Sequence, residues 1–243
     1  MITKPNLILV HGAWHGAWVW EPVLPTLEAH FNVIALDLPG RKPNAPFYKK
    51  ISLKSYVQAI EQCLLTLEGP IFLLGHSLAG LAISQVAENH PDKIDGLIYV
   101  AAFIPQNGES LFDIASNFKS PGASSELIFE QRQNILDIQK SEKTKTLFFN
   151  ACPEALATQA LAHVHPEPFK AFTTPVTLSA NNFGRVKKIY IQCTEDLAIP
   201  PLYQTQMAQN AGITEIIDLK ADHSPYFSHP QGMCEMLINT FTP

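Results

Sequence analysis

Residues 71–81 read IFLLGHSLAGL and place a serine, Ser77, between a short apolar run and a helical pattern. The apolar run at 71–74 is bounded by Gly75, which is typical of a buried strand. From Leu78 onward, apolar residues recur at helical spacing until Pro91 ends the pattern. Ser77 is therefore predicted to lie in a tight strand-to-helix turn, the arrangement of a nucleophile elbow, usually written G-x-S-x-G.

The motif departs from its usual form at the second small position. Ala79 stands there in place of glycine, and Gly80 follows it. Bulky side chains two positions either side of the serine would clash in so sharp a turn. Alanine adds a single methyl group, so the turn can still close where the neighbouring strand leaves room. A serine in a glycine-rich turn without any chemistry is the alternative, and the pentapeptide alone does not decide between the two.

Composition indicates a single globular domain with a large core. The chain has 243 residues, of which 46% are hydrophobic and 16% charged, and a formal net charge of −5. Lysine and arginine are scattered, so we expect no nucleic-acid partner and no polybasic membrane surface. Since no apolar run approaches the ~20 residues of a membrane span, we expect no membrane association.

The start of the chain and its cysteines bear on the cellular compartment. Residues 1–10, MITKPNLILV, lack the apolar region and the cleavage site of a signal peptide. The four cysteines are far apart and show neither C-x-x-C nor zinc-site spacing, so we expect free thiols and no metal. A cytoplasmic protein without a cofactor is therefore expected, and the sequence leaves open whether it forms a homodimer.

Strand and helix patterns alternate along most of the chain. Bounded apolar runs predict six strands, at Asn6–Val10, Phe31–Leu36, 71–74, Asp95–Phe103, Lys188–Cys193 and Ile213–Leu219. Helical spacing predicts helices at 22–30, 53–67, 78–90, 200–211 and 230–241. This alternation predicts an α/β fold, with a mostly parallel sheet of about six strands flanked by helices.

The alternation is interrupted between residues 105 and 186, where the sequence is more polar and prolines are scattered. We expect one domain whose core comprises residues 1–104 and 187–243, with a helical cap inserted at about 105–186. Parallel sheets place their sites at the carboxyl ends of the strands. The cap is therefore expected to cover that edge of the sheet.

Asp196 and His223 are the candidate partners of Ser77. A serine hydroxyl is a weak nucleophile, so it needs a base, a group that orients the base, and donors for the oxyanion. Where a nucleophile elbow is used, the acid and then the histidine follow the serine along the chain. Asp196 comes just beyond the strand predicted at 188–193, and His223 just beyond the last strand. Both are expected at carboxyl strand ends, on the side of Ser77.

Other acids and histidines remain as alternatives. Glu195 adjoins Asp196, Asp222 adjoins His223, and Asp113 would serve if the acid followed the fourth strand. The remaining histidines are expected at the surface or at helix ends (His30, His90, His229), in the cap (His163, His165), beside the serine (His76), or packed in the loop after the first strand (His11, His15).

The loop after the first strand, HGAWHGAW at residues 11–18, is expected to complete an oxyanion hole. One donor should be the backbone N–H of Leu78, directly after the nucleophile, and the second the backbone N–H of Ala13. Gly12 would let this backbone approach the substrate closely. The expected pocket residues are Gly12, Trp14, His76 and Phe148.

The chain resembles the α/β-hydrolase superfamily, and within it the group of plant methyl esterases, hydroxynitrile lyases and their bacterial esterase relatives. The resemblance rests on LVHGAWHGAWVW (9–20), GHSLAG (75–80), LIYVAAFIP (97–105), CTEDLAIP (193–200) and ADHSPYFSHP (221–230). It implies the same triad of Ser77, Asp196 and His223, the same two backbone donors, and small carboxylic esters as substrates.

The expected function is therefore a serine esterase that acts on a small-molecule ester through an acyl-enzyme. A hydroxynitrile lyase-like enzyme is one alternative. In the lyases that the chain resembles, a threonine stands where this chain has Gly12 and a lysine follows the histidine, whereas here Ser224 follows His223. A non-catalytic ligand-binding protein is the other alternative, because a fold does not prove activity.

Overall fold

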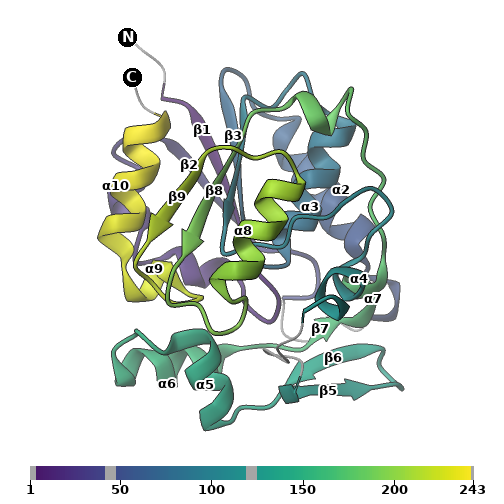
Figure 1. Ribbon diagram of the computed structural model, residues 1–243, viewed down its shortest axis with the longest axis vertical. Helices are drawn as coiled ribbons and strands as arrows, with labels where there is room; N and C mark the ends of the chain where they lie inside the picture. The colour runs from purple at the N-terminus through teal and green to yellow at the C-terminus, as the bar shows by residue number, and fades with distance from the viewer. Residues whose placement is uncertain (1–3, 42–47, 119–124, 242–243) are drawn as a thin grey trace.

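A computed structural model describes residues 4–41, 48–118 and 125–241, and its centre is a six-stranded sheet (Figure 1). The strand order is β2-β1-β3-β4-β8-β9, and every neighbouring pair is parallel. The strands are β1 (Asn6–Val10), β2 (Asn32–Leu36), β3 (Ile71–His76), β4 (Gly96–Val100), β8 (Lys188–Cys193) and β9 (Ile216–Leu219). The predicted α/β class is confirmed, with the strands at the expected places.

Helices cover both faces of this sheet, which is why its central strands are continuous apolar runs. Every residue of β1 and of β4 is buried. The helices of the core are α1 (Leu24–Leu27), α2 (Leu53–Leu64), α3 (Ala79–Asn89), α8 (Pro201–Asn210), α9 (Pro225–Ser228) and α10 (Pro230–Phe241), with short 3₁₀ turns η1 (Ala17–Trp20) and η2 (Tyr48–Lys50). Figure 1 shows α10 on one side of the sheet and α2 and α3 on the other.

The helix predicted at 22–30 is wrong in extent. The chain instead forms the 3₁₀ turn η1, then turn structure, then a single turn of α-helix, α1. Two prolines, Pro22 and Pro25, lie in this stretch. Proline has no N–H to donate and its ring clashes with the preceding turn of a helix. The apolar spacing therefore reflects side chains packed on the core, without a continuous helix behind it.

The insert between β4 and β8 forms the cap, but a purely helical cap is wrong. It contains the helices α4 (Leu111–Ser116), α5 (Glu142–Phe149), α6 (Glu154–His163) and α7 (Phe169–Thr173), the 3₁₀ turn η4 (Phe183–Arg185), and three strands, β5 (Leu127–Glu130), β6 (Ile135–Ile138) and β7 (Glu167–Pro168). These strands form an antiparallel sheet in the order β5-β6-β7. Strands of two to four residues are too short to show a period of two in the sequence. Residues 119–124 of the predicted insert lie outside the described residues.

The cap sheet and the helices α5 and α6 lie below the core in Figure 1, whereas β1 begins and α10 ends at the opposite end of the molecule. The loops that leave the carboxyl ends of the core strands run toward the cap. Among the helices of the described residues, none combines the length and the apolar character needed to cross a membrane.

Candidate active site

Ser77 lies in the sharp turn between the end of β3 at His76 and the start of α3 at Ala79. Its φ is +54°, in the left-handed region that non-glycine residues rarely adopt. A conformation of this kind costs about 1–3 kcal/mol and persists only where the surroundings hold it. Here the N–H groups of Gly80 and Phe103 both donate to the Ser77 carbonyl at 3.1 Å. The predicted strained elbow is confirmed.

The glycine pattern around the elbow follows from close packing. A Cβ atom on Gly80 would lie only 2.1 Å from the carbonyl oxygen of Phe103, so no other residue fits there. At Gly75 a Cβ atom would lie 2.8 Å from Cδ1 of Ile83. The methyl group of Ala79 is fully buried at the start of α3. The departure from G-x-S-x-G is therefore tolerated, because the tightest approach falls on Gly80.

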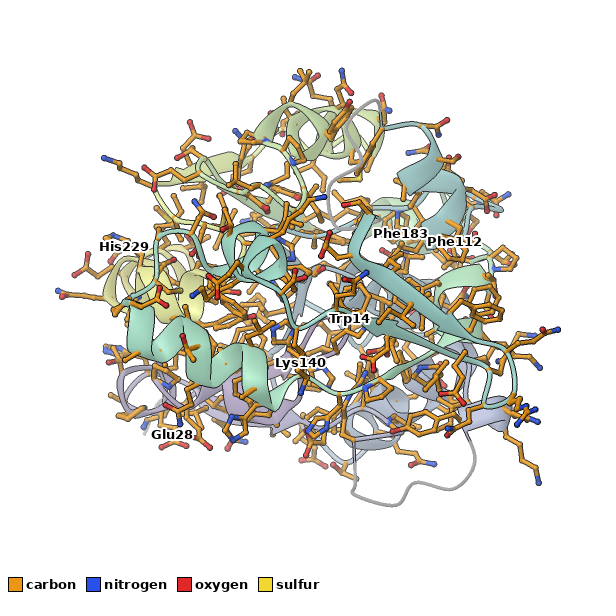
Figure 2. The ribbon with its side chains drawn as sticks, turned by 90° about the horizontal axis from the view of Figure 1, so that it is seen from below. Trp14, Glu28, Phe112, Lys140, Phe183 and His229 are labelled. Atoms are coloured by element: carbon orange, nitrogen blue, oxygen red, sulfur yellow. The ribbon has the colours of Figure 1, made fainter. Side chains whose placement is uncertain are left out.

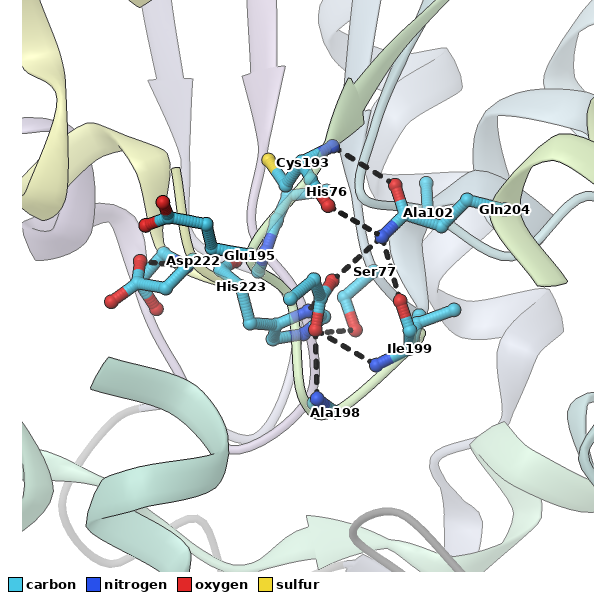
Figure 3. A network of polar contacts seen from close by, with 12 residues as sticks. His76, Ser77, Ala102, Cys193, Glu195, Ala198, Ile199, Gln204, Asp222 and His223 are labelled. Carbon is cyan, nitrogen blue, oxygen red and sulfur yellow. Dashed lines mark hydrogen bonds and ion pairs between the residues drawn. The ribbon is translucent and has the colours of Figure 1, made fainter. Parts of the chain in front are cut away.

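His223 lies beside Ser77 (Figure 3), and its other ring nitrogen faces Asp196, which is the order of a catalytic triad. Nε2 of His223 lies 3.2 Å from Oγ of Ser77, and its Nδ1 lies 2.8 Å from Oδ2 of Asp196. A carboxylate only accepts hydrogen bonds, so Nδ1 of His223 donates to Asp196, and Nε2 is left to accept from the serine hydroxyl. Ser77, Asp196 and His223 are all buried. The geometry is that of a nucleophile, a base and a group that orients the base.

Asp196 is held in place by three donors besides His223. Its Oδ1 accepts the backbone N–H groups of Ala198 and Ile199 at 2.8 Å each, and its Oδ2 accepts Nε2 of Gln204 at 3.0 Å (Figure 3). Gln204 is fully buried and also accepts the Cys193 N–H at 3.1 Å through its Oε1. The carboxylate therefore has little freedom to rotate away from the histidine.

Sequence reasoning missed Gln204. The helix α8 that carries it contains two further glutamines, Gln206 and Gln209, and both are exposed. No local pattern distinguishes the buried glutamine from the other two. Its role depends on how α8 packs against β8 and the loop after it.

The rival acids lie elsewhere. Glu195 is half-buried and pairs with Lys220 at 3.9 Å. Asp113 is exposed and lies in the first turn of α4, where it exchanges hydrogen bonds with Ser110. Asp222 is buried, but its carboxylate accepts the N–H groups of Ser224 and of Ala151 in the cap. In the part of the chain that the structure describes, Asp196 is the carboxylate hydrogen-bonded to His223.

Three other buried histidines, His11, His15 and His76, lie near the elbow and remain neutral. Burial lowers the pKa of His15 to about 3, and it lowers the pKa values of His11 and His76 well below the usual range. Nε2 of His76 donates to the His223 carbonyl at 2.7 Å, so this ring holds the backbone of the triad histidine. Each of the three donates one ring N–H to a backbone carbonyl of the site.

The remaining histidines lie away from the triad. His30, His163, His165 and His229 are exposed, and His90 is partly exposed beside Glu61. Neither His163 nor His165, the two in the cap, lines the cavity above Ser77. The predicted surface positions of His30, His90 and His229 are confirmed.

A cavity of about 390 Å³ opens directly onto Ser77 and His223. Four predicted residues line it: Ala13, Trp14, Leu78 and Phe148. Gly12 and His76 do not line it. A Cβ atom on Gly12 would lie 2.8 Å from both Nδ1 of His76 and Cβ of Ser77, so both residues lie behind the nucleophile.

Apolar side chains from the cap make the rest of the cavity wall. Leu111, Phe112, Leu127 and Phe172 come from the cap, and Phe103 and Ile199 from the core. No acidic or basic side chain of the described residues lines it, apart from the imidazole of His223. The described residues also hold no group of three or more His, Cys, Asp or Glu side chains placed to bind a metal ion. The arrangement provides a nucleophile at the bottom of an apolar pocket.

Comparisons with known proteins agree with this geometry. A model of the "Alpha/beta hydrolase family" matches residues 7–236. The chain is 32% identical over 249 residues to "Putative methylesterase 11, chloroplastic" of Arabidopsis thaliana, and this match covers 96% of the chain but 63% of that protein. It is 28% identical over 251 residues to "Pyrethroid hydrolase" of Sphingobium wenxiniae, covering 98% of the chain and 88% of that protein.

Solved structures show the same likeness. The crystal structure of a pyrethroid hydrolase from Sphingobium faniae JZ-2 superimposes with a TM-score of 0.89 at 28% identity, covering 98% of this chain and 97% of that one. The chain thus spans less than two thirds of the methylesterase and almost all of the solved hydrolase.

Proposed function

This chain belongs to the alpha/beta hydrolase family, and we propose that it is a cofactor-free serine esterase that cleaves a carboxylic ester. The observation that carries the proposal is the continuous hydrogen-bonded series Ser77–His223–Asp196 facing an apolar cavity. The likeness to a methylesterase and to a pyrethroid hydrolase supports the same class of reaction.

The reaction follows from the positions of the two proton-carrying groups. Nε2 of His223 takes the hydroxyl proton as Oγ of Ser77 attacks the ester carbonyl, and Asp196 stabilises the imidazolium that forms. The proton then passes to the leaving alcohol, and an acyl group remains on Ser77. His223 next takes a proton from water, which attacks the acyl-enzyme and releases the acid.

The backbone N–H groups of Ala13 and Leu78 are the proposed donors to the oxyanion. Both residues line the cavity beside Ser77, and neither N–H donates to another residue in the described parts of the chain. Leu78 is also the residue before α3, whose positive dipole end favours a developing negative charge. Donors held in place before the reaction stabilise such a charge without reorganisation.

The cavity favours an ester with a bulky, uncharged acyl or alcohol group. Its wall is built from Trp14, Phe112, Phe148, Phe172 and further apolar side chains, and among the described residues no lysine or arginine lines it to pair with a charged substrate. An apolar pocket of this kind binds by excluding water from apolar surface. Aryl and branched alkyl esters should therefore be better substrates than esters of charged acids.

The test is hydrolysis of p-nitrophenyl butyrate and of a series of methyl and aryl esters by the purified protein. We expect turnover that is lost in Ser77→Ala. The matched control is Ser84→Ala, which removes a buried serine hydroxyl of α3 that hydrogen-bonds the Gly80 carbonyl and the hydroxyl of Tyr99 in β4. Wild-type turnover in Ser77→Ala would contradict the triad, and binding of these esters without any turnover would favour a ligand-binding protein.

A hydroxynitrile lyase is the alternative within the resembling group, and two positions argue against it. Gly12 has no room for a side chain, because a Cβ atom there would contact Ser77. Ser224, directly after His223, is buried and uncharged, so no cation is available there to receive cyanide. We expect no cyanide release from mandelonitrile above the buffer rate, and release that requires Ser77 would overturn the esterase proposal.

A further inference from the structure

Glu167 places a carboxylate from the cap against the loop that follows β1. It lies in β7, its side chain is 0% exposed, and its Oε2 accepts the backbone N–H of Trp14 at 2.6 Å. The guanidinium of Arg41 and the hydroxyl of Tyr56 donate to the same carboxylate. A buried carboxylate is tolerated only when it is paired and hydrogen-bonded. Three donors from the core therefore converge on one acceptor from the cap.

The cap holds Trp14 through each of its polar groups. Besides the bond from its N–H to Glu167, its carbonyl accepts the His165 N–H at 2.8 Å, and its Nε1 donates to the Leu136 carbonyl at 2.9 Å. Leu136 and Glu167 face each other in the pairing of β6 with β7. Figure 2, which looks at the molecule from the cap side, shows Trp14 near the middle of the view. The cap therefore holds Trp14, a residue of the core, through Leu136 of β6, Glu167 of β7 and the nearby His165.

The backbone of Trp14 needs this support. Its φ is +62°, which is rare for a bulky side chain and persists where the surroundings over-determine it. The peptide that joins residues 13 and 14 is held from both sides. The Ala13 carbonyl accepts Nδ1 of His15 at 2.7 Å, and the Trp14 N–H donates to Glu167. If the carboxylate were absent, a buried N–H would lose its acceptor and this peptide could rotate.

We propose that Glu167 is a positioning residue for the oxyanion hole: it fixes the Ala13–Trp14 peptide, which directly follows the Gly12–Ala13 peptide that carries the Ala13 N–H, and so limits the directions that this N–H can take. The inference rests on the proposed function, in which that N–H receives the oxyanion. Arg41 donates to the same oxygen, Oε2, and holds it from the core side, so the donor is in place only when the cap is seated on the core. Cap docking and assembly of the oxyanion hole are then one event.

Two double variants test the bond itself. Arg41→Met with Glu167→Gln removes the ion pair but keeps an amide oxygen for the Trp14 N–H. Arg41→Met with Glu167→Met removes the ion pair and that acceptor together. Neutral replacement of both partners of a buried pair avoids an unpaired charge in the core. The two variants differ in side-chain shape only by the amide group, so their comparison isolates the acceptor.

We expect the Met–Met variant to have kcat lower than the Met–Gln variant by roughly 10- to 100-fold, because a misplaced donor loses transition-state stabilisation. KM should agree within about threefold. Phenylboronic acid, which forms a tetrahedral adduct on a catalytic serine, should bind more weakly by the same factor as kcat falls. A purely structural role would lower the fraction of folded enzyme without moving the inhibitor affinity of the remainder.

Tyr56→Phe is the control for damage to the cluster. It removes the bond to Oε1 of Glu167 and leaves the Trp14 bond to Oε2, so kcat should stay within about threefold of wild type. Equal kcat and equal phenylboronic acid affinity in the two double variants would overturn the inference, and so would a loss in Tyr56→Phe as large as in the Met–Met variant.

If a double variant does not fold, Glu167→Asp gives the same test with the ion pair kept. The shorter side chain withdraws the carboxylate from the Trp14 N–H, and kcat and inhibitor affinity should fall together. Unchanged values in Glu167→Asp would overturn the inference. Turnover that survives Ser77→Ala would instead contradict the proposed function, so the two failures are distinguishable.

Discussion

The edge of the core sheet and the cap contribute to the site in different ways. Ser77 follows β3, Asp196 follows β8 and His223 follows β9, so each reacting group lies directly beyond a strand of the core. The parallel pairing of the strands brings these three ends to one edge. Each side chain is buried and held by hydrogen bonds from neighbouring core residues.

The cap supplies surfaces instead of reacting groups. Its helices α4, α5 and α7 carry Phe112, Phe148 and Phe172 of the cavity wall, and its strand β7 carries Glu167. The three aromatic rings shape the cavity wall, and Glu167 contributes one buried carboxylate. In the function that we propose, the chemistry belongs to the core, whereas the cap supplies most of the cavity wall and the carboxylate that holds the loop after β1 (residues 11–18).

The largest effect is expected at the core edge, from Asp196→Asn. The variant keeps the shape of the side chain but favours the wrong tautomer of His223, so kcat should fall by about 10⁴-fold. The measurement is kcat for p-nitrophenyl butyrate at pH 7.5. Glu195→Gln is the matched control, since Glu195 is adjacent but half-exposed and paired with Lys220. A larger loss in Glu195→Gln would mean that the acid has been misassigned.

A smaller loss is expected from Gly12→Ala, which places an atom behind the nucleophile without touching the cap. The new Cβ atom would lie 2.8 Å from both His76 Nδ1 and Ser77 Cβ, so the loop at residues 11–18 must shift away from the serine. We expect kcat to fall by roughly 10²- to 10³-fold, the cost of losing one oxyanion donor. Wild-type kcat in this variant would show that the loop does not have to approach Ser77 so closely.

The buried histidines of the core edge predict a loss of stability in acid. The pKa of His15 is about 3 in the folded chain and about 6.5 when unfolded. As pH falls below 6.5 only the unfolded chain takes up the proton, so the free energy of unfolding decreases. Between pH 6.5 and 5 this amounts to about 2 kcal/mol for His15.

Urea unfolding at the two pH values measures this loss. His15→Asn, whose amide can still donate to the Ala13 carbonyl, should make the free energy of unfolding less dependent on pH by that amount. His11 and His76 act in the same direction, because burial lowers their pKa values too. An unchanged pH dependence in His15→Asn would indicate that this ring is not buried in its neutral form.

The buried histidines beside the triad should not shape the pH dependence of the rate. His11, His15 and His76 stay neutral because burial lowers their pKa values, so none of the three should add a limb of its own to the pH profile of esterase activity. The pH profile of kcat in His15→Asn should therefore have the same shape as that of the wild type. A profile that changes shape in His15→Asn would mean that this ring takes part in the reaction.

The smallest effect is expected in the cap, from Phe112→Ala. Phe112, labelled in Figure 2, stacks on Phe172 at 5.8 Å between ring centroids and lines the cavity from the cap. Loss of this apolar contact should raise KM for a phenyl or naphthyl ester about 10-fold and leave kcat within about threefold. Methyl acetate, which is too small to reach this wall, is the control substrate. A fall in kcat for both substrates would assign the cap a part in the chemistry.

Short local patterns were enough to predict the core strands, the elbow at Ser77, and the two candidate partners, Asp196 and His223. The reason is that each depends on a few consecutive residues: an apolar run, a tight turn that excludes side chains, and a polar residue just beyond a strand. The parallel sheet then brings the three turns together without any further information. The same locality predicted the surface positions of His30, His90 and His229.

Packing between distant segments decided the remainder. Gln204 donates to Asp196 from α8, and Glu167 accepts the Trp14 N–H from the cap. The strands β5, β6 and β7 pair although each is too short to be recognised in the sequence. The stretch at 22–30 does not form a continuous helix. Its prolines interrupt the helical hydrogen bonds, and its apolar side chains pack on the core without one. Burial of a single amide or carboxylate depends on neighbours far away in the chain, so only the tertiary structure reveals it.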